Sequence, residues 1–193
     1  MSSMLTNLRS AVITGFVFAF ILIFFLAQGS FDQTAFNMWL LRWFHVLAAI
    51  MWVGILYYFN FVQIPNMGKI PDDQKPAISK VIEPAALWWF RWGAVGTLLS
   101  GLILAHLSGY LHDAMTFSDG YWPIGIGMWL GIIMFVNVWA VIWPNQKKAL
   151  GIIEVDAETK AKAARKAMLF SRKNVILSIP MLVAMTVAQN SFS

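Results

Sequence analysis

Four ionisable side chains lie inside stretches of this sequence that are otherwise almost entirely apolar. They are Arg42, His45, Arg91 and His106, and His112 follows a few residues beyond the last of them. An ionisable group is costly inside a membrane, so each of the four is a candidate functional residue. Imidazole binds haem iron and guanidinium binds carboxylate or phosphate, which favours a redox site or an anion site.

The two histidines fall at similar depth on helices that follow one another in the chain. Two imidazoles on facing helices commonly hold a b-type haem, so we predict His45 and His106 as the iron ligands of haem b near the outer leaflet. Arg42 lies three residues before His45 on the same helical face, where it could pair with a haem propionate or an anionic substrate. Trp52, seven residues after His45, continues this cofactor-binding face inwards.

Each of these assignments has a structural alternative. A transmembrane histidine is often only hydrogen-bonded to a Ser, Thr or Asn of another helix, and His106 could lie among the lipid headgroups. Arg91, a second candidate for substrate binding, could instead extend its guanidinium towards the cytoplasmic surface.

The composition of the whole chain indicates what surrounds these residues. Of 193 residues, 59% are hydrophobic, 15% aromatic and only 12% charged. Soluble domains average about 45–50% apolar and about 25% charged residues. A soluble chain of this length could not bury so much apolar surface, which predicts an integral membrane protein.

The apolar stretches predict five transmembrane helices, at about residues 11–28, 35–64, 85–110, 121–143 and 174–189. The first is longer than the apolar core of a signal peptide, so we interpret it as a retained helix. Prolines suggest the other boundaries: the second helix should stop at Pro65, the third should begin at Glu83-Pro84, and the fourth should close at Pro144. Pro180 should kink the fifth helix and free a backbone carbonyl.

The distribution of Lys and Arg predicts the orientation. Twelve of the fourteen basic residues lie before helix 1, between helices 2 and 3, or between helices 4 and 5, and these segments share one side of a five-span topology. Basic segments stay in the cytoplasm. The predicted fold is therefore an all-α bundle of five transmembrane helices, a single membrane domain over residues 1–193. Its N-terminus is cytoplasmic, its C-terminus is periplasmic, and its location is the bacterial inner membrane.

The predicted cytoplasmic loop, residues 144–173, carries most of the positive charge. Its segment Ala157–Lys166 is rich in helix-forming residues, so we expect it to be partly helical. The net charge of +5 is explained by such cytoplasmic segments, and we expect the lipid bilayer, and no nucleic acid, as a partner.

Other residues are expected to serve the architecture. Gly93, Thr97 and Gly101 form a small-residue stripe, and Gly127 and Gly131 form another, which lets helices approach closely. Eight tryptophan and tyrosine residues fall near the ends of the predicted spans, as in an interfacial aromatic belt. Two amides, Asn137 and Asn174, could bond between helices or line a cavity.

Several short segments of the sequence resemble the membrane domain of the bacterial urate hydroxylase family, the urate oxidase N-terminal domain. They are Arg42-Trp43-Phe44-His45-Val46 with the following Trp52-Val53-Gly54, Trp89-Phe90-Arg91-Trp92, Trp143-Pro144-Asn145-Gln146-Lys147-Lys148, and Ser171 to Pro180. Together they cover roughly residues 38–185. The resemblance implies a helical membrane domain that oxidises urate and passes electrons to a fused c-type cytochrome.

The chain differs from this pattern in two ways. It has no cysteine, which excludes a covalently attached haem c and Cys-ligated iron–sulfur clusters, so electrons would need a separate cytochrome c or a quinone. It also has Trp88, Gly125 and Ser171-Arg172-Lys173 where the family pattern has further histidines.

Two functions therefore stand side by side. The first is a small membrane redox protein that binds haem b, an oxidoreductase if the resemblance extends to urate oxidation. The second is a non-catalytic subunit that packs against a larger respiratory or photosynthetic membrane complex.

Overall fold

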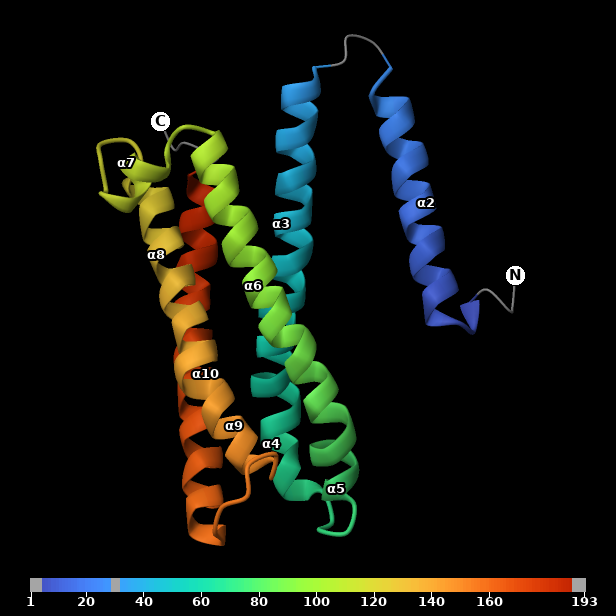
Figure 1. Cartoon of the computed structure of the whole chain (residues 1–193), viewed down its shortest axis with the longest axis vertical. Coiled ribbons are helices and arrows are strands. Elements are labelled where there is room, and N and C mark those ends of the chain that lie inside the picture. The colour runs from blue at the N-terminus through green and yellow to red at the C-terminus, as the bar shows by residue number, and fades with distance from the viewer. Residues whose placement is uncertain (1–4, 29–31, 189–193) are drawn as a thin grey trace. The chain divides into compact units, whose positions relative to one another are not determined.

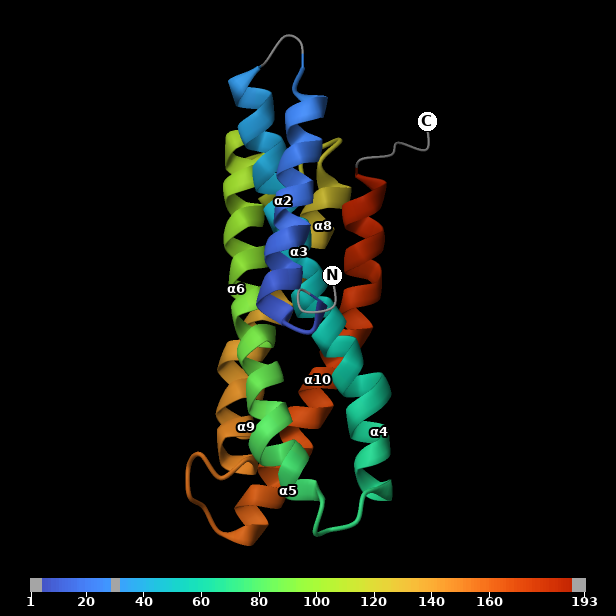
Figure 2. The same ribbon diagram turned by 90° about the vertical axis from the view of Figure 1, so that its right-hand side faces the viewer.

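The computed structural model describes residues 5–28 and 32–188, and every regular element within these ranges is a helix (Figures 1 and 2). Five helical stretches in this part of the chain are long and apolar enough to cross a membrane, as predicted. They are Leu8–Leu26, Gln33–Lys69, Lys75–Leu107, Trp122–Ala149 and Ala157–Val187. The protein is thus all-helical, with the composition of a multi-pass membrane protein.

The chain divides into two units, Met1–Trp39 and Leu40–Ser193. The first unit contains α2 (Leu8–Leu26) and the first turns of α3 (Gln33–Tyr57). The side chain of Asn7 accepts a hydrogen bond from the Arg9 amide and so caps α2, while Asp32 accepts bonds from the first amides of α3. The predicted first span, 11–28, therefore corresponds to a helix that begins three residues earlier and ends at Leu26.

The second unit contains the other four long helical stretches. The first is α3 with its continuations η1 (Tyr58–Gln63), α4 (Ile64–Asn66) and η2 (Met67–Lys69). The second joins α5 (Lys75–Ala77), η3 (Ile78–Ile82) and α6 (Glu83–Leu107), and the third joins α8 (Trp122–Val136), η4 (Asn137–Ile142) and α9 (Trp143–Ala149). The last is α10 (Ala157–Val187), and a short helix, α7 (Leu111–Met115), lies between α6 and α8.

Three prolines predicted to end or begin helices lie inside continuous helical stretches instead. Each follows a π-helical segment by two residues: η1 precedes Pro65, η3 precedes Pro84 and η4 precedes Pro144. A proline lacks an N–H and its ring clashes with the carbonyl four residues earlier. A π turn adds one residue to the turn, which moves that carbonyl away from the ring.

The backbone hydrogen bonds support this explanation. The residue just before each proline donates its N–H to the carbonyl five residues earlier: Ile64 to Phe59, Glu83 to Ile78, and Trp143 to Val138. The predicted helix ends at Pro65 and Pro144 are therefore wrong, because the chain widens its helix at each proline rather than ending it. At Pro84 the α-helix α6 begins at Glu83, as predicted, but the π-helical η3 precedes it without a break.

Helix α10 is longer than the predicted fifth span, and it confirms the predicted helical segment Ala157–Lys166. It begins at Ala157, so it takes in much of the predicted cytoplasmic loop as well as the predicted span from residue 174. Asp156 caps its first turn, since its carboxylate accepts bonds from the amide and the hydroxyl of Thr159. The helix continues through Pro180 as α-helix, without the π segment seen at the other three prolines.

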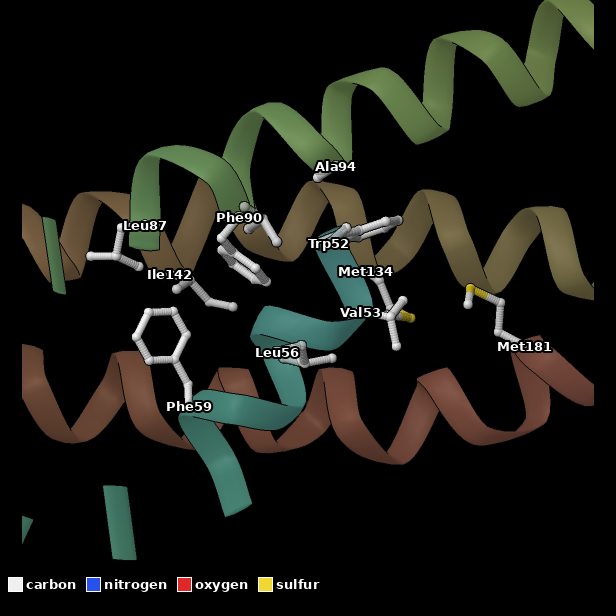
Figure 3. Packing of buried hydrophobic residues seen from close by; sticks show 11 residues of the cluster. Trp52, Val53, Leu56, Phe59, Leu87, Phe90, Ala94, Met134, Ile142 and Met181 are labelled. Atoms are coloured by element: carbon white, nitrogen blue, oxygen red, sulfur yellow. The ribbon is translucent and has the colours of Figure 1, made fainter. Parts of the chain in front are cut away.

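The core of the second unit is built where α3 lies among the other helices. Trp52, Leu56 and Phe59 project from α3 and η1 towards Phe90 of α6 and Ile142 of η4, as Figure 3 shows. Trp52 and Leu56 are at most 1% exposed. The spacing of these residues, three or four apart, places them on one face of the helix.

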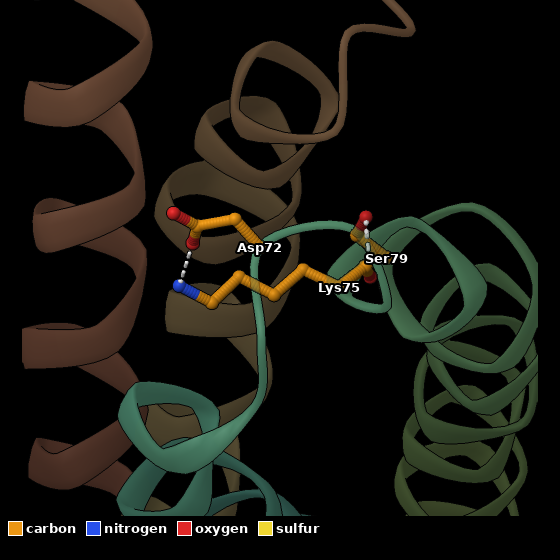
Figure 4. Close-up of polar contacts among 3 residues, drawn as sticks. All are labelled: Asp72, Lys75 and Ser79. Atoms are coloured by element: carbon orange, nitrogen blue, oxygen red, sulfur yellow. Dashed lines mark hydrogen bonds and ion pairs between the residues drawn. The ribbon is translucent and has the colours of Figure 1, made fainter.

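Basic residues gather at one end of the second unit. The segments that join η2 to α5 and α9 to α10 lie at the end where α4, α5 and α9 are labelled, opposite α7 (Figure 1), and Lys69, Lys75, Lys147 and Lys148 stand on the helix ends beside them. In the first of these segments Lys75 forms an ion pair with Asp72, and its backbone carbonyl accepts a bond from the hydroxyl of Ser79 (Figure 4). The hydrogen bond from Lys75 and its positive charge hold the pKa of Asp72 below its usual range.

Candidate functional site

The imidazole of His45 is held between α3 and α6. Its Nδ1 lies 3.0 Å from Oγ of Ser100, which is buried on α6. The ring also lies on Gly101, where a Cβ atom would come within 2.9 Å of Cε1 of His45. Any residue larger than glycine at position 101 would therefore displace the imidazole.

The hydrogen bonds of Ser100 indicate which nitrogen of His45 carries the proton. The Ser100 hydroxyl donates to the backbone carbonyl of Gly96, and the carbonyl of Thr97 is a second, more distant acceptor at 3.2 Å. A hydroxyl has one hydrogen, so towards His45 it acts as the acceptor and Nδ1 is the donor. In the neutral ring Nε2 then keeps a free lone pair, the arrangement found in many metal-binding histidines.

His106 lies on another face of α6. It follows Gly101 by five residues, which turns it by about 140° around the helix axis from the residue that touches His45, and its side chain is exposed. The two histidines are therefore not brought together across the α3–α6 contact. Their pairing on one haem iron stays a prediction, and the geometry favours His45 acting alone.

Trp52, predicted as part of the cofactor-binding face, belongs to the core. It is 1% exposed, and the backbone at this residue packs on Gly93 of α6, where a Cβ would be 3.1 Å from the Trp52 amide nitrogen. The close approach of helices predicted at Gly93 is therefore confirmed, because α3 and α6 pack together at this residue. Gly127 has the same role on α8, where it faces the side chain of Met185.

Arg42 lies at the same end of the second unit as α7. It is exposed, and its positive charge acts on the hydroxyl of Tyr110, which stacks on Tyr121 with ring centroids 6.0 Å apart. Burial raises the pKa of Tyr110, and the charge of Arg42 partly offsets that effect. His112, next to this pair on α7, is exposed. Arg42 and His45 are one helical turn apart, so a molecule at this end of the bundle could contact both.

A second cluster of polar residues, not identified as a cluster from the sequence, lies along α10. Its buried face carries Ser171, Asn174 and Ser178. Ser171 accepts a hydrogen bond from Asn60, and Ser178 bonds with the hydroxyl of Tyr57. The spacing of three and four residues between small polar side chains on α10 was the signal available in the sequence.

The two amides whose role the sequence left open bond between helices. Asn137 donates to the side-chain oxygen of Asn174 at 3.0 Å, and Asn174 donates to the backbone carbonyl of Met134 at 3.0 Å. Met134 and Asn137 flank the start of the π segment η4. Asn174 therefore binds α10 to α8 where the helix geometry of α8 changes.

Arg91 packs on an aromatic ring at the end of the bundle that carries the basic segments. Its Cζ lies 3.4 Å from the ring centroid of Trp143, a cation–π contact between α6 and α9. Its Nη1 is buried and has no hydrogen-bond partner. The two residues predicted to bind substrate, Arg42 and Arg91, therefore lie far apart along the bundle. Arg42 is at the end that carries α7, and Arg91 contacts Trp143 near the opposite end.

The described residues contain no group of three His, Asp or Glu side chains that could hold a metal ion. Among them His45 is the candidate ligand, because the contact of its Nδ1 with Ser100 orients the ring. Chemically, the arrangement suits one imidazole ligand or a hydrogen bond to a substrate, with the cation of Arg42 one turn away.

These features describe an all-helical bundle, of membrane-compatible composition, with one oriented histidine and several polar contacts between helices. The family model described as urate oxidase N-terminal matches residues 114–192. This match covers α8, η4, α9 and α10. It includes two of the segments that carried the resemblance, Trp143-Pro144-Asn145-Gln146-Lys147-Lys148 and Ser171 to Pro180. The similarity to this family is therefore confirmed for the C-terminal part of the chain, less than half of its length. No curated protein and no solved structure matches the chain significantly.

Proposed function

We propose that the chain is a membrane redox protein of the bacterial inner membrane, with its functional site at the outer end of the bundle and the N-terminus in the cytoplasm. The observation that carries the proposal is His45, whose Nδ1 is hydrogen-bonded to Ser100 of the neighbouring helix α6. The match of residues 114–192 to the urate oxidase N-terminal family supports an oxidative role.

The cofactor proposed for this site is haem b, and His45 is the residue that fits it. His45 would bind the iron through Nε2, and Ser100 would hold the ring orientation. Haem would supply a one-electron carrier. The exposed position of His106, turned away from His45, argues for a site with His45 as the protein ligand in place of the predicted histidine pair.

Arg42 is proposed to bind an anion at the same site. Its guanidinium is exposed one turn from His45, where it could pair with a haem propionate or with an anionic substrate such as urate. Electrons would pass to a separate cytochrome c or a quinone, since the chain has no cysteine with which to hold haem c.

An optical spectrum of the purified protein tests the cofactor. We expect a reduced b-type band that is lost in His45→Ala and kept in His106→Ala. Loss of the band in both variants would instead support the predicted pair, His45 and His106, as the two iron ligands. A colourless preparation that co-purifies with a larger membrane complex would contradict the proposal and favour the accessory subunit.

A turnover assay tests the substrate separately. Urate oxidation would be followed with oxygen, a soluble cytochrome c or a quinone as acceptor. Turnover that falls in Arg42→Gln, while the haem band stays, would support urate as the anion. If urate gives no turnover with any acceptor, the redox role has a different substrate.

A further inference from the structure

Four cations surround one exposed leucine on α10. Arg165 and Lys166 lie four and three residues before Leu169, and Arg172 and Lys173 lie three and four residues after it. At about 100° per residue, all four lie within about 60° of Leu169 around the helix axis. The four cations are exposed, as is Leu169 (44%). These five residues are called the α10 cationic face.

The opposite side of α10 is the one that packs in the bundle. Ala163, Ala167, Ser171 and Asn174 are buried, and the last two bond to neighbouring helices. Ala167 and Ser171 lie two residues before and after Leu169, which places them about 160° from it around the axis. The α10 cationic face therefore points away from the core of the second unit.

No carboxylate of α10 lies among these cations. The chain has no Asp or Glu after Glu158. In the part of the chain that the structure describes, the ion pairs are Lys75–Asp72 and Lys162–Glu158, and neither includes a residue of the face. Four positive charges thus lie along about 12 Å of helix without an acidic partner, which favours an anionic ligand.

The length of α10 places this face at the edge of a bilayer. The part of the helix from Asn174 to Val187 rises only about 21 Å, at about 1.5 Å per residue. A hydrocarbon core of about 30 Å needs about 20 residues. Counted back from Val187, these residues begin at Met168, next to Leu169. The α10 cationic face therefore straddles the boundary between the acyl chains and the headgroups.

The side chains around this boundary match that depth. Ile176 and Val183, exposed by 69% and 57%, lie within about 40° of Leu169 and continue its side of the helix as an apolar surface. Nζ of Lys173 lies 4.1 Å from the centroid of the Phe170 ring, one turn nearer the N-terminus of α10. The ammonium thus extends towards the basic end of the second unit (Figure 1), as a lysine does when it reaches the headgroups from the acyl region.

We infer that the α10 cationic face binds the headgroups of anionic phospholipids. Its guanidinium and ammonium groups contact lipid phosphates, and Leu169 contacts the upper acyl chains between them. A lipid fits this surface better than an acidic protein does, because a lipid covers both the cations and the apolar residues that continue them. The lipid site depends on insertion in a membrane but not on the electron-transfer role.

Fluorescence quenching at position 169 tests the lipid. The chain has no cysteine, so Leu169→Cys gives a single site for a bimane label. The labelled full chain is placed in nanodiscs of equimolar phosphatidylcholine and phosphatidylglycerol, with bromine on the acyl chains of one lipid or the other. We expect brominated phosphatidylglycerol to quench more strongly than brominated phosphatidylcholine, and the difference to shrink as salt is added.

Two double variants of the labelled chain separate this face from the general positive charge. Arg165→Gln with Arg172→Gln removes two cations from the face. Lys69→Gln with Lys80→Gln is the matched control, because it removes two exposed cations from η2 and η3, at the same end of the second unit. The first should lower the preference for phosphatidylglycerol by at least about fivefold, the effect of one basic group near an anionic membrane surface. The control should leave the preference unchanged.

Three outcomes would overturn the inference. Equal quenching by the two brominated lipids in the labelled chain would show no preference for anionic lipid and would favour an acidic protein as the partner. An equal loss of preference in both double variants would assign it to the overall charge of that end of the bundle. In nanodiscs of phosphatidylcholine alone, inorganic phosphate that shifts the bimane emission as much as phosphatidylglycerol does would assign the face to free anions.

Discussion

The imidazole of His45 is held by two neighbours on α6 that act in different ways. Ser100 forms a hydrogen bond with its Nδ1, and Gly101 leaves space for its ring. A hydrogen bond fixes the orientation of a side chain only where neighbouring atoms also leave a single position for it. The glycine is therefore as much a part of this site as the serine.

The variant Gly101→Ala tests the packing of His45. The added methyl group would come within 2.9 Å of Cε1 of His45, so the ring must move away from Ser100. The loss of that bond should outweigh the helix propensity of alanine and destabilise the fold by about 1 kcal/mol. The measurement is the free energy of unfolding in detergent, with the ring nitrogens followed by NMR.

Gly54→Ala is the matched control on α3. Nothing lies within 4 Å of a Cβ at position 54, so this variant should be neutral or stabilising by up to about 1 kcal/mol. Equal stability of the two variants, with the nitrogen shifts of His45 unchanged, would show that Gly101 does not position the imidazole.

A second prediction at the scale of single residues concerns the pH dependence of the α10 cap. Hydrogen bonds from Thr159 lower the pKa of Asp156 below its ordinary value. A carboxyl group with a lowered pKa stabilises the folded helix end at pH values above its ordinary pKa, and this contribution is lost as the pH falls through the lowered pKa. The amide of Thr159 should therefore lose protection from hydrogen exchange in that acidic range.

Asp156→Asn separates the cap from its charge. Asparagine also caps helices but does not ionise, so the variant should keep the protection of the Thr159 amide without the acidic transition. The same transition in Asp156→Asn and in the wild type would mean that another group controls the end of α10.

At the scale of the elements, the main lesson is the effect of proline on a packed helix. Pro65, Pro84 and Pro144 each lie two residues after a π segment, and the helices continue on both sides. The π turn changes which residues face the neighbouring helix. Asn60 and Asn137, whose amides bond to α10, lie within such segments.

Pro144→Ala is predicted to let η4 return to α-helical geometry. Removing one residue from a turn rotates the following segment by about 100° and shifts it by about 1.5 Å, which would turn Trp143 and Lys147 away from Arg91. The chain has no cysteine, so spin labels at Trp88→Cys and Lys147→Cys can report the change. We expect their separation to change by several ångströms, on the order of one helix radius.

Pro123→Ala is the control for this experiment. Pro123 lies in the first turn of α8 with no π segment before it, so the label separation should stay the same. An unchanged separation in Pro144→Ala would show that packing, and not the proline, maintains the π turn of η4.

The five helices could be predicted from the sequence because each apolar stretch is long enough to identify a span by itself. The proline boundaries could not, because a proline at the first turn of a helix and a proline after a π turn have the same local sequence. His45 was identified from its type and its apolar surroundings. Its partners Ser100 and Gly101 are more than fifty residues away, and only the packing of α3 on α6 reveals them.

The polar contacts of α10 show the same limit. Small polar residues at a spacing of three or four can face a neighbouring helix or water, and the sequence does not distinguish the two. In the fold Ser171, Asn174 and Ser178 all face the interior. Which partners they meet, Asn60, Asn137 and Tyr57, depends on the order of the helices in the bundle.

At the scale of the whole molecule, the proposed orientation in the membrane rests on the positions of the charged residues. The segments after η2 and after α9 lie at the same end of the second unit, with Lys69, Lys75, Lys147 and Lys148 on the helix ends beside them, and α7, which carries His112 and Asp113, lies at the other end (Figure 1). A basic end stays in the cytoplasm. This orientation would place Arg42 and His45 towards the periplasm and the contact of Arg91 with Trp143 towards the cytoplasm.

The orientation can be measured with reporter fusions to the full chain and to chains ending in the loops. Alkaline phosphatase, which is active only in the periplasm, should be active after residue 188 or after Asp119 and inactive after Asp73 or Glu154. Green fluorescent protein, which matures in the cytoplasm, should give the opposite pattern. Replacing the lysines at positions 147, 148, 160 and 162 by glutamine should weaken this preference, because the cytoplasmic bias follows Lys and Arg rather than net charge. Phosphatase activity after Glu154 in the unmodified chain would invert the bundle, and the proposed electron partner of His45 would then have to be cytoplasmic.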